Sequence, residues 1–255
     1  MTGIIDDLLT GLPSGNLLDI RIGAFWTAVV VETGGQRSCG LAATLRGFAE
    51  HHYGGGPAVA DAGRLLDRTP TELAQLARST SLMEASIGFA AINALLSPQP
   101  QPWVDLNAEE VIARHGAGKK VALVGHFPFV PRLREIAGTL WVLELDPRED
   151  DLPATAAAEV IPQADIVAIT GTTLLNHTFD SLMALRKPDA LTLVLGPSTP
   201  PSPRLFNHGV HLISTALVED IDSVLRAVCQ GANFRQIRRQ GVRLVTLPHP
   251  DHPGL

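Results

Sequence analysis

The sequence predicts an α/β protein in which an N-terminal α+β part is followed by a doubly wound parallel sheet. Residues 19–45 are rich in Ile, Val, Trp and Thr, which favours an antiparallel meander, and helix-start signals follow them. Beyond the proline-rich stretch 97–103, short apolar runs alternate with helical stretches, as in strands covered on both faces. With 255 residues, 45% of them apolar, the chain can bury one large core or two modest ones.

The first predicted elements are two or three strands within residues 19–45, where Gly34 and Gly35 indicate a tight turn. Two helices should follow, because "TPTE" at 69–72 and "SLME" at 81–84 each have the pattern of a capping box. The second helix, "LMEASIGFAAINALL", has apolar residues at helical spacing, so we expect it to pack one face on the meander.

The proline-rich stretch "SPQPQPW" marks the predicted junction between the two parts, because its prolines remove backbone donors. We predict a first domain over 1–98, a linker with a connecting helix over 99–118, and a second domain over 119–255. The strands predicted in the second domain are "KVALVG", "LWVLELD", "DIVAITG", "LTLVLG", "HLIST" and "VRLVTL", with "FDSLMALRK" and "IDSVLRAVCQ" as helices between them.

This alternation predicts a Rossmann-like sheet, in which ligands bind beyond the carboxyl ends of the strands. The segments "GHFPF", "ELD", "GTTLLNHT" and "GPSTPPSP" all fall there. Residues 170–178, "TGTTLLNHT", hold six side chains that can form hydrogen bonds where only a turn is needed. Asn176 or Thr178 could cap the next helix, but a cap uses one or two of the six. We therefore expect a ligand role for the segment, and a loss of binding in Asn176→Ala that exceeds its loss of stability.

Glu144 stands nineteen residues after Gly125, close to the spacing at which dinucleotide-binding proteins place a ribose-binding acid. A solvent-facing residue at a strand end is the alternative. "GHFPFVP" lacks the GxGxxG turn, and Pro128 and Pro131 remove donors that a phosphate would use. We therefore expect no classical NAD or FAD site. Phe127 and Phe129 offer flat apolar surface to a ring, or pack in the core.

Histidine is the other candidate chemistry. His126, His177 and His208 follow three different strands and are the candidate metal ligands, if they converge at the ligand edge. The chain has no HExxH or GxSxG motif, so we expect little tightly bound metal without an organic chelator. "GPSTPPSP", 196–203, could form a rigid pocket wall or a stiff surface loop.

Charge and cysteine content restrict the kinds of partner and the cellular compartment that we expect. A net charge of −6 with scattered Lys and Arg predicts neither a nucleic-acid nor a membrane partner. Cys39 and Cys229 form no CxxC pattern, which fits a reducing cytoplasm, and the first residues lack a signal peptide's features. We expect a cytoplasmic protein with a small-molecule partner, and a homo-oligomer stays open.

Several segments resemble successive signature segments of the putative heavy-metal chelation family: "RSTSLMEASIGFAAINALL", "GKKVALVGHFPFVPRL", "VLELDP", "DIVAITGTTLLNHT" and "VLGPSTPPSPRLFNHGV". The resemblance implies an enolase N-terminal-like domain followed by a Rossmann-like domain, and a cleft between them. It also implies partial likeness to Rossmann methyltransferases and a part in making or handling pterin-like, siderophore-like or metal-chelating molecules. Carried over to this chain, the site residues are Gly125, His126, Phe127, Glu144, Thr170, Gly171, Thr172, Thr173, Asn176, Gly196, Pro197, Ser198 and Thr199, joined by Glu84 and Asn93.

Two classes of function stay open at this point. One is an enzyme acting on a small metabolite, with His126 or Glu144 as the catalytic group that exchanges protons. It includes a methyltransferase-like transferase and a hydrolase or condensing enzyme. The other is a protein that retains a metal chelate without chemistry. The cofactor candidates are a metal chelate and an adenosyl methyl donor.

Overall fold

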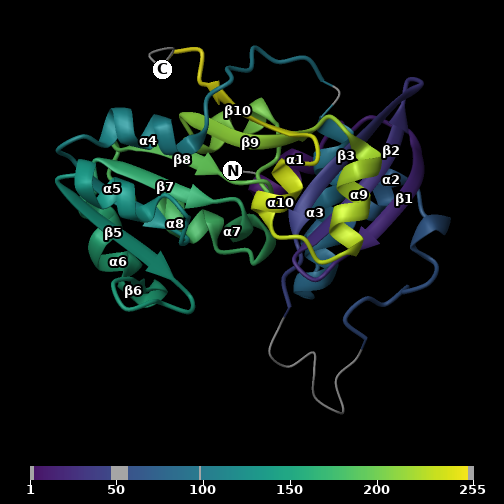
Figure 1. Cartoon of the computed structure of the whole chain (residues 1–255), viewed down its shortest axis with the longest axis horizontal. Helices are drawn as coiled ribbons and strands as arrows, with labels where there is room; N and C mark the ends of the chain where they lie inside the picture. The colour runs from purple at the N-terminus through teal and green to yellow at the C-terminus, as the bar shows by residue number, and fades with distance from the viewer. Residues whose placement is uncertain (1–2, 47–56, 98, 252–255) are drawn as a thin grey trace.

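The computed structural model describes residues 3–46, 57–97 and 99–251. Within these ranges the strands form two separate sheets, one antiparallel with three strands and one mostly parallel with seven. Figure 1 shows the antiparallel sheet at one end of the molecule and the large sheet towards the other, with helices packed around both. The chain is therefore a mixed α/β protein, as predicted.

The small sheet is the predicted meander. It consists of β1 (Asn16–Ile22), β2 (Trp26–Thr33) and β3 (Gln36–Ala43), which pair in chain order. Gly34 and Gly35 join β2 to β3 with φ angles of 59° and 79°. Two positive φ angles define a type I′ hairpin turn, which matches the twist of the strands and strongly favours glycine.

Helix α3 (Leu82–Leu96) packs on β2 and β3, as predicted, but it is buried on more than one face. Every residue from Ala85 to Leu96 is buried, because α2 (Pro70–Ala74) and the 3-10 turn Gln75–Arg78 cover the side that faces away from the sheet. A helix that is apolar all round is expected in such a position. The prediction of a single buried face was therefore too narrow.

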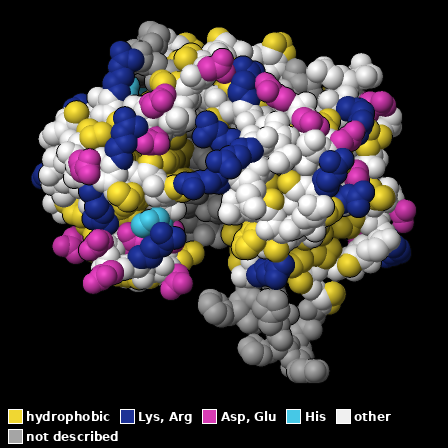
Figure 2. Space-filling model, viewed as in Figure 1, with side chains coloured by type: hydrophobic (Ala, Val, Ile, Leu, Met, Phe, Trp, Pro, Cys, Tyr) yellow, Lys and Arg dark blue, Asp and Glu magenta, His cyan; other side chains and the backbone are white. Residues whose placement is uncertain are grey.

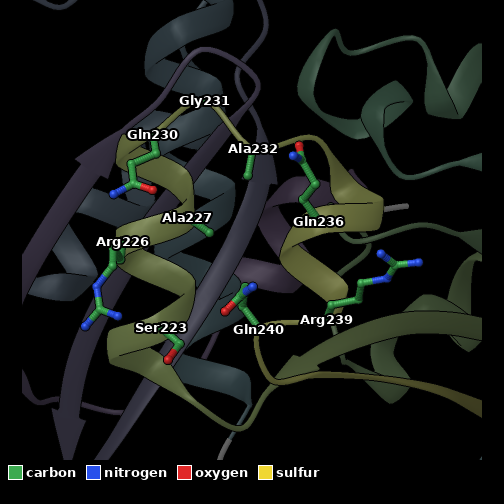
Figure 3. Close-up of a pocket in the computed structure, with 9 residues that line it drawn as sticks. All are labelled: Ser223, Arg226, Ala227, Gln230, Gly231, Ala232, Gln236, Arg239 and Gln240. Atoms are coloured by element: carbon green, nitrogen blue, oxygen red, sulfur yellow. The ribbon is translucent and has the colours of Figure 1, made fainter.

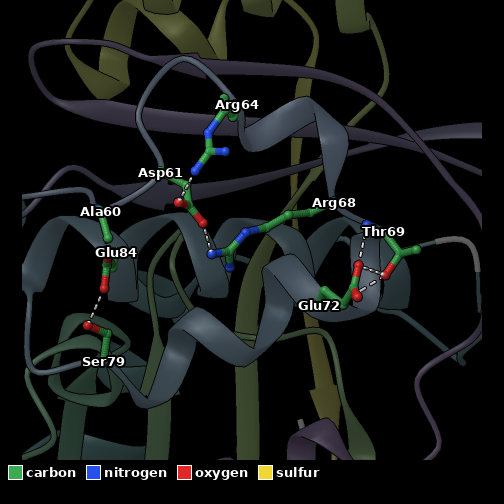
Figure 4. A network of polar contacts seen from close by, with 8 residues as sticks. All are labelled: Ala60, Asp61, Arg64, Arg68, Thr69, Glu72, Ser79 and Glu84. Atoms are coloured by element: carbon green, nitrogen blue, oxygen red, sulfur yellow. Dashed lines mark hydrogen bonds and ion pairs between the residues drawn. The ribbon is translucent and has the colours of Figure 1, made fainter.

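The two predicted helix starts differ in detail. Thr69 and Glu72 form the complete capping box, with both reciprocal hydrogen bonds present. Ser81 accepts from the Glu84 N–H, but the Glu84 carboxylate does not return the contact. It accepts instead from the Ala60 N–H at 2.9 Å and the Ser79 hydroxyl at 2.6 Å, as Figure 4 shows. The second capping box is thus only half formed, because the loop before α3 uses the carboxylate.

The large sheet has the strand order β10-β9-β8-β7-β4-β5-β6, so the chain reverses its direction of progress between β4 and β7. All strands are parallel except β10, which pairs antiparallel with β9. The strands are β4 (Lys120–Val124), β5 (Thr139–Glu144), β6 (Leu152–Pro153), β7 (Ile166–Thr170), β8 (Leu191–Leu195), β9 (Leu212–Val218) and β10 (Val242–Pro248). The six strands predicted in this part are all present, and the two-residue β6 is additional.

Both faces of the large sheet are covered, because successive strand residues point to opposite sides. Leu123 and Ala168 belong to the core under α4 and α5, whereas Ala122 and Val167 belong to the core under α6, α7 and α8. This explains why the strands have no polar alternation. The helices are α1 (Ile4–Leu9), α4 (Ala108–Gly116), α5 (Val130–Ile136), α6 (Ala157–Val160), α7 (Thr172–Leu175), α8 (Phe179–Leu185), α9 (Ile221–Cys229) and α10 (Phe234–Arg238).

The two sheets meet through a shared apolar core and direct hydrogen bonds. β3 contacts β9, and α9 packs on β1 and β2. The Ala43 N–H donates to the Ser198 hydroxyl at 2.9 Å, and the Asn93 side chain donates to the carbonyls of Leu41 and Ser198 at 2.8 and 3.4 Å. The loop after β8 is therefore fastened to the small sheet and to α3.

Candidate functional site

The loops after β4, β7 and β8 lie together at the carboxyl edge of the large sheet. Gly125 and Gly196 have φ angles of 103° and 106°, which favour glycine strongly. A side chain at Gly125 would start 3.1 Å from Thr170, and the Phe127 ring lies beside both glycines. The structure thus brings together four of the predicted site residues, Gly125, Phe127, Thr170 and Gly196.

A cavity of about 700 Å³ opens at this edge, within the usual size range of small-molecule sites. Its wall includes the loop after β4, the starts of α4 and α5, the end of β8, the middle of β9 and of β10, α10, and one residue of the small sheet. Figure 2 shows a hollow with hydrophobic side chains in its wall and Lys or Arg side chains beside α10 at its edge. The lining residues used below are Trp26, Ala108, Glu109, His126, Phe127, Phe129, Arg132, Gly196, Pro197, Ser214, Thr215, Phe234, Arg235 and Arg238.

His126 has the geometry of an oriented acid–base group. Its Nδ1 lies 2.8 Å from an Asp151 carboxylate oxygen, and the Asp151 side chain is only 1% exposed. The Nε2 of His126 has no hydrogen-bond partner among the described residues. A carboxylate on one ring nitrogen fixes the tautomer and leaves the other nitrogen available to a ligand in the cavity. The same arrangement supports a histidine that ligates a metal.

The sequence did not single out Asp151, because it lies in the acidic run "DPREDD", which is typical of a solvated loop. Burial alone would raise the pKa of Asp151. The hydrogen bonds from His126 and the Arg148 N–H, and the charges of His126 and Arg134, outweigh burial, so the pKa lies below its ordinary value of 3.8. Asp151 is therefore a carboxylate at neutral pH.

Glu144 is engaged by the backbone. One carboxylate oxygen accepts the His126 N–H at 2.7 Å and the other accepts the Leu145 N–H at 3.0 Å. These bonds hold the loop after β4 next to the end of β5. Glu144 therefore positions the backbone of His126, the other predicted catalytic residue.

Residues 170–178 bond mostly to one another. The Thr170 and Thr172 hydroxyls lie 3.1 Å apart, and the Thr173 hydroxyl donates to the Thr170 carbonyl at 2.7 Å. Asn176 Oδ1 accepts from both the N–H and the hydroxyl of Thr178, at 3.2 and 2.7 Å. These contacts shape the turn from β7 through α7 into α8, which begins after Thr178 without a side-chain cap.

The remaining predicted residues divide between the cavity and the junction of the sheets. Gly196 and Pro197 line the cavity, whereas Ser198 and Thr199 are buried beyond it. Gly171 lies so close to this loop that a side chain would start 2.6 Å from the Thr199 nitrogen. Asn93 and Glu84 form the structural contacts described above and are not part of the cavity wall.

The three candidate metal-ligating histidines do not converge. His126 contacts Asp151, His177 contacts the Ala77 carbonyl at 3.0 Å, and His208 contacts Asp7 at 3.2 Å. Among residues 3–46, 57–97 and 99–251, no three His, Cys, Asp or Glu side chains are grouped to hold a metal ion. The described side chains alone thus form no candidate metal centre.

A second cavity of about 350 Å³ lies between α9 and α10. In Figure 3 its two arginines, Arg226 and Arg239, extend away from each other on opposite sides. None of the predicted site residues lies in its wall, so we take the larger cavity as the candidate site.

In the described part of the chain no helix has the length and apolar character needed to cross a membrane.

Known proteins share the fold of the whole chain. The protein is 27% identical to the uncharacterized protein MJ0500 of Methanocaldococcus jannaschii over 82% of this chain and 81% of that protein. It superposes on a protein with unknown function from Desulfitobacterium hafniense with a TM-score of 0.81 and 29% identity, over 96% of this chain and 98% of that one. A Pyrococcus horikoshii protein, 21% identical, has the same fold, with a TM-score of 0.81 over 97% of this chain and 100% of that one.

Two family models match the chain, and both are described as putative heavy-metal chelation. One matches residues 5–96, which hold the small sheet and α3. The other, the DUF364 model, matches residues 107–246, which hold the large sheet and nearly all of the cavity wall. Because this second match alone spans more than half of the sequence, the chain belongs to the putative heavy-metal chelation family.

Proposed function

We propose that the protein binds or processes a small metal-chelating molecule, siderophore-like or pterin-like, in the cavity beside His126. The observation that carries the proposal is the cavity itself, at the carboxyl edge of a parallel sheet and with His126 in its wall. The strand order supports a Rossmann-like second domain, since β6-β5-β4-β7-β8-β9 repeats the doubly wound order. Trp26, from β2, supports a site shared with an enolase N-terminal-like first domain.

The metal enters as cargo, carried by the small molecule. The described side chains offer no group of three ligands, so a chelator has to supply most of the coordination. His126 has one nitrogen free to accept a proton from a chelating hydroxyl or to complete the coordination of a bound metal. Asp151 would stabilise the imidazolium that forms on proton transfer, and it would make the imidazole a stronger ligand if the nitrogen bound the metal.

The test is to identify what the purified protein retains. Ala108 lines the cavity at the start of α4, so Ala108→Trp should obstruct part of it with an indole ring. Glu110 lies on the same helix, is exposed and does not line the cavity, which makes Glu110→Trp the matched control. Mass spectrometry of molecules released on denaturation, and elemental analysis of the same samples, measure chelator and metal together.

We expect wild type and Glu110→Trp to retain the same molecule, and Ala108→Trp to lose it together with any metal. Equal melting temperatures of the two variants would show that the loss is local. Retention by Ala108→Trp would place the binding site elsewhere. If folded wild type retains no molecule and binds no added metal chelate, the proposed function is wrong.

A further inference from the structure

We infer that the ligand of the cavity is a flat aromatic anion, whose acidic group pairs with Arg235 and Arg238 while its ring lies against Phe127 and Phe129. This inference rests on the proposed function and names the chemical class of the ligand. It follows from the charge of the cavity wall, from the hydrogen-bond donors that lack partners there, and from the arrangement of the rings.

The cavity wall is positive in a protein that is negative overall. Among the described residues that line it, three arginines face one glutamate, Glu109, so the wall has a net charge of +2, whereas the whole chain has −6. Arg132 is neutralised by Glu109 at 2.7 Å. The excess positive charge therefore belongs to Arg235 and Arg238, and a concave surface of one sign attracts ligands of the other.

These two arginines have no counter-ion from the protein. Neither forms an ion pair or side-chain hydrogen bond with any residue in 3–46, 57–97 or 99–251. They stand three positions apart on α10, which places them on the same side of the helix. Both side chains are exposed, so solvent screens their charges, and their planar guanidinium forks suit a carboxylate or a phosphate.

Other polar groups of the cavity wall are buried or already engaged. The indole N–H of Trp26 is buried and has no hydrogen-bond partner in the described chain. In contrast, the hydroxyls of Ser214 and Thr215 are already engaged, with Thr246 at 2.7 Å and the Thr199 carbonyl at 2.6 Å. The buried indole N–H is closed to the cavity and the two hydroxyls are satisfied, so the arginines are the lining donors that remain for an anionic ligand.

The rings set the shape of the ligand. Phe127 and Phe129 stack with centroids 5.1 Å apart and planes 10° apart, and Trp26 meets Phe234 at 5.4 Å and 50°. All four rings line the cavity. Aromatic faces favour a flat ring, since stacking adds to the burial of apolar area, and a ring with an acidic substituent satisfies both halves of the wall.

Three probes separate charge from shape. Salicylate is a planar anion, phenol is planar and uncharged at neutral pH, and cyclohexanecarboxylate is an anion without a flat ring. Isothermal titration calorimetry would measure the affinity of each for wild type, for Arg235→Ala/Arg238→Ala, for Phe127→Leu and for Arg114→Ala. Arg114 is an exposed arginine of α4 outside the cavity wall and is the control.

We expect wild type and the control to bind salicylate with equal affinity. The double arginine variant should bind it at least about tenfold more weakly, because the loss of one charge-assisted hydrogen bond has an effect of that size. Phe127→Leu should weaken salicylate more than cyclohexanecarboxylate. If phenol binds as tightly as salicylate, or if the arginine variant binds salicylate as wild type does, the inference that the ligand is an anion is wrong. If salicylate and cyclohexanecarboxylate bind wild type with equal affinity, the inference that the ligand has a flat ring is wrong.

The proposed function and this inference fail separately. If a metal chelate occupies the cavity in wild type and is lost in Ala108→Trp, while no salicylate binds, the proposed function stands and the aromatic anion is wrong. If salicylate binds as expected but no chelator or metal is ever retained, the ligand class stands and metal handling is wrong.

Discussion

Two segments at the carboxyl edge of the large sheet differ in how their polar groups are used. Residues 170–178, after β7, are dense in Thr, Asn and His, and those side chains bond within the segment or, for His177, to the Ala77 carbonyl. The cavity wall is less dense in polar residues, yet His126 Nε2 after β4 and the side chains of Arg235 and Arg238 on α10 are without partners in the described chain. The unpaired groups, rather than the number of polar residues, indicate the site.

The largest loss of stability that we expect comes from a substitution in the closely packed segment 170–178. Gly171 has an ordinary φ of −60°, but a methyl group there would start 2.6 Å from the nitrogen and the hydroxyl of Thr199. Gly171→Ala should lower the free energy of unfolding by about 3 kcal/mol through overpacking. Gly3 also precedes a helix with a negative φ, but its nearest neighbour would be 3.8 Å away. Gly3→Ala is therefore the control in urea denaturation, and an equal loss would show that close packing is not the cause.

The sequence predicted much of the fold because local patterns determine it. The type I′ turn at Gly34 and Gly35, the capping box at Thr69 and the apolar strands are each read within a few residues. The antiparallel direction of β10 and the two-residue strand β6 could not be predicted in this way. An apolar run of residues does not show whether its strand will be parallel or antiparallel, and two residues are too few to show a periodicity.

The site was harder to predict because its parts are far apart in the chain. Trp26, Asp151 and Arg238 come from three distant segments, and none belongs to a motif. The residues after β7 were singled out by type, yet the sequence does not show with which groups a threonine or asparagine forms its hydrogen bonds. Pairing of that kind is decided by tertiary structure.

The loop after β8 lines the cavity with Gly196 and Pro197 and is buried at Ser198, where a substitution tests the buried part. Ser198 is 2% exposed and accepts the Ala43 N–H, which joins the loop to the small sheet. Ser198→Ala should lower the free energy of unfolding by about 2 kcal/mol, because the half-buried Ala43 N–H loses its acceptor. The exposed Ser181, whose hydroxyl bonds the Thr178 carbonyl, is the control. Guanidinium denaturation measures both, and a smaller loss in Ser198→Ala than in Ser181→Ala would contradict the assignment.

The pair of His126 and Asp151 tests the cavity side through pH. Because the pKa of Asp151 is lowered in the folded protein, its carboxylate contributes stability above the unfolded pKa, near 3.8, and loses it as pH falls through the native pKa. Asp151→Asn should lower the free energy of unfolding by roughly 1.5 kcal/mol near neutral pH. The difference from wild type should shrink below about pH 4. A difference that is independent of pH in urea denaturation would show that the charge of Asp151 is not responsible.

The smallest effect concerns Asn176, where sequence and structure favour different outcomes. The residue types predict a loss of ligand binding, whereas Asn176 Oδ1 accepts two hydrogen bonds from Thr178 at the start of α8. Asn176→Ala should therefore lower the free energy of unfolding by about 1 kcal/mol, as for a lost helix cap, and leave salicylate affinity unchanged. Calorimetric titration and thermal denaturation of the same sample measure both. Should affinity fall tenfold while the melting temperature is unchanged, the segment after β7 belongs to the site, and unpaired groups would no longer suffice to find it.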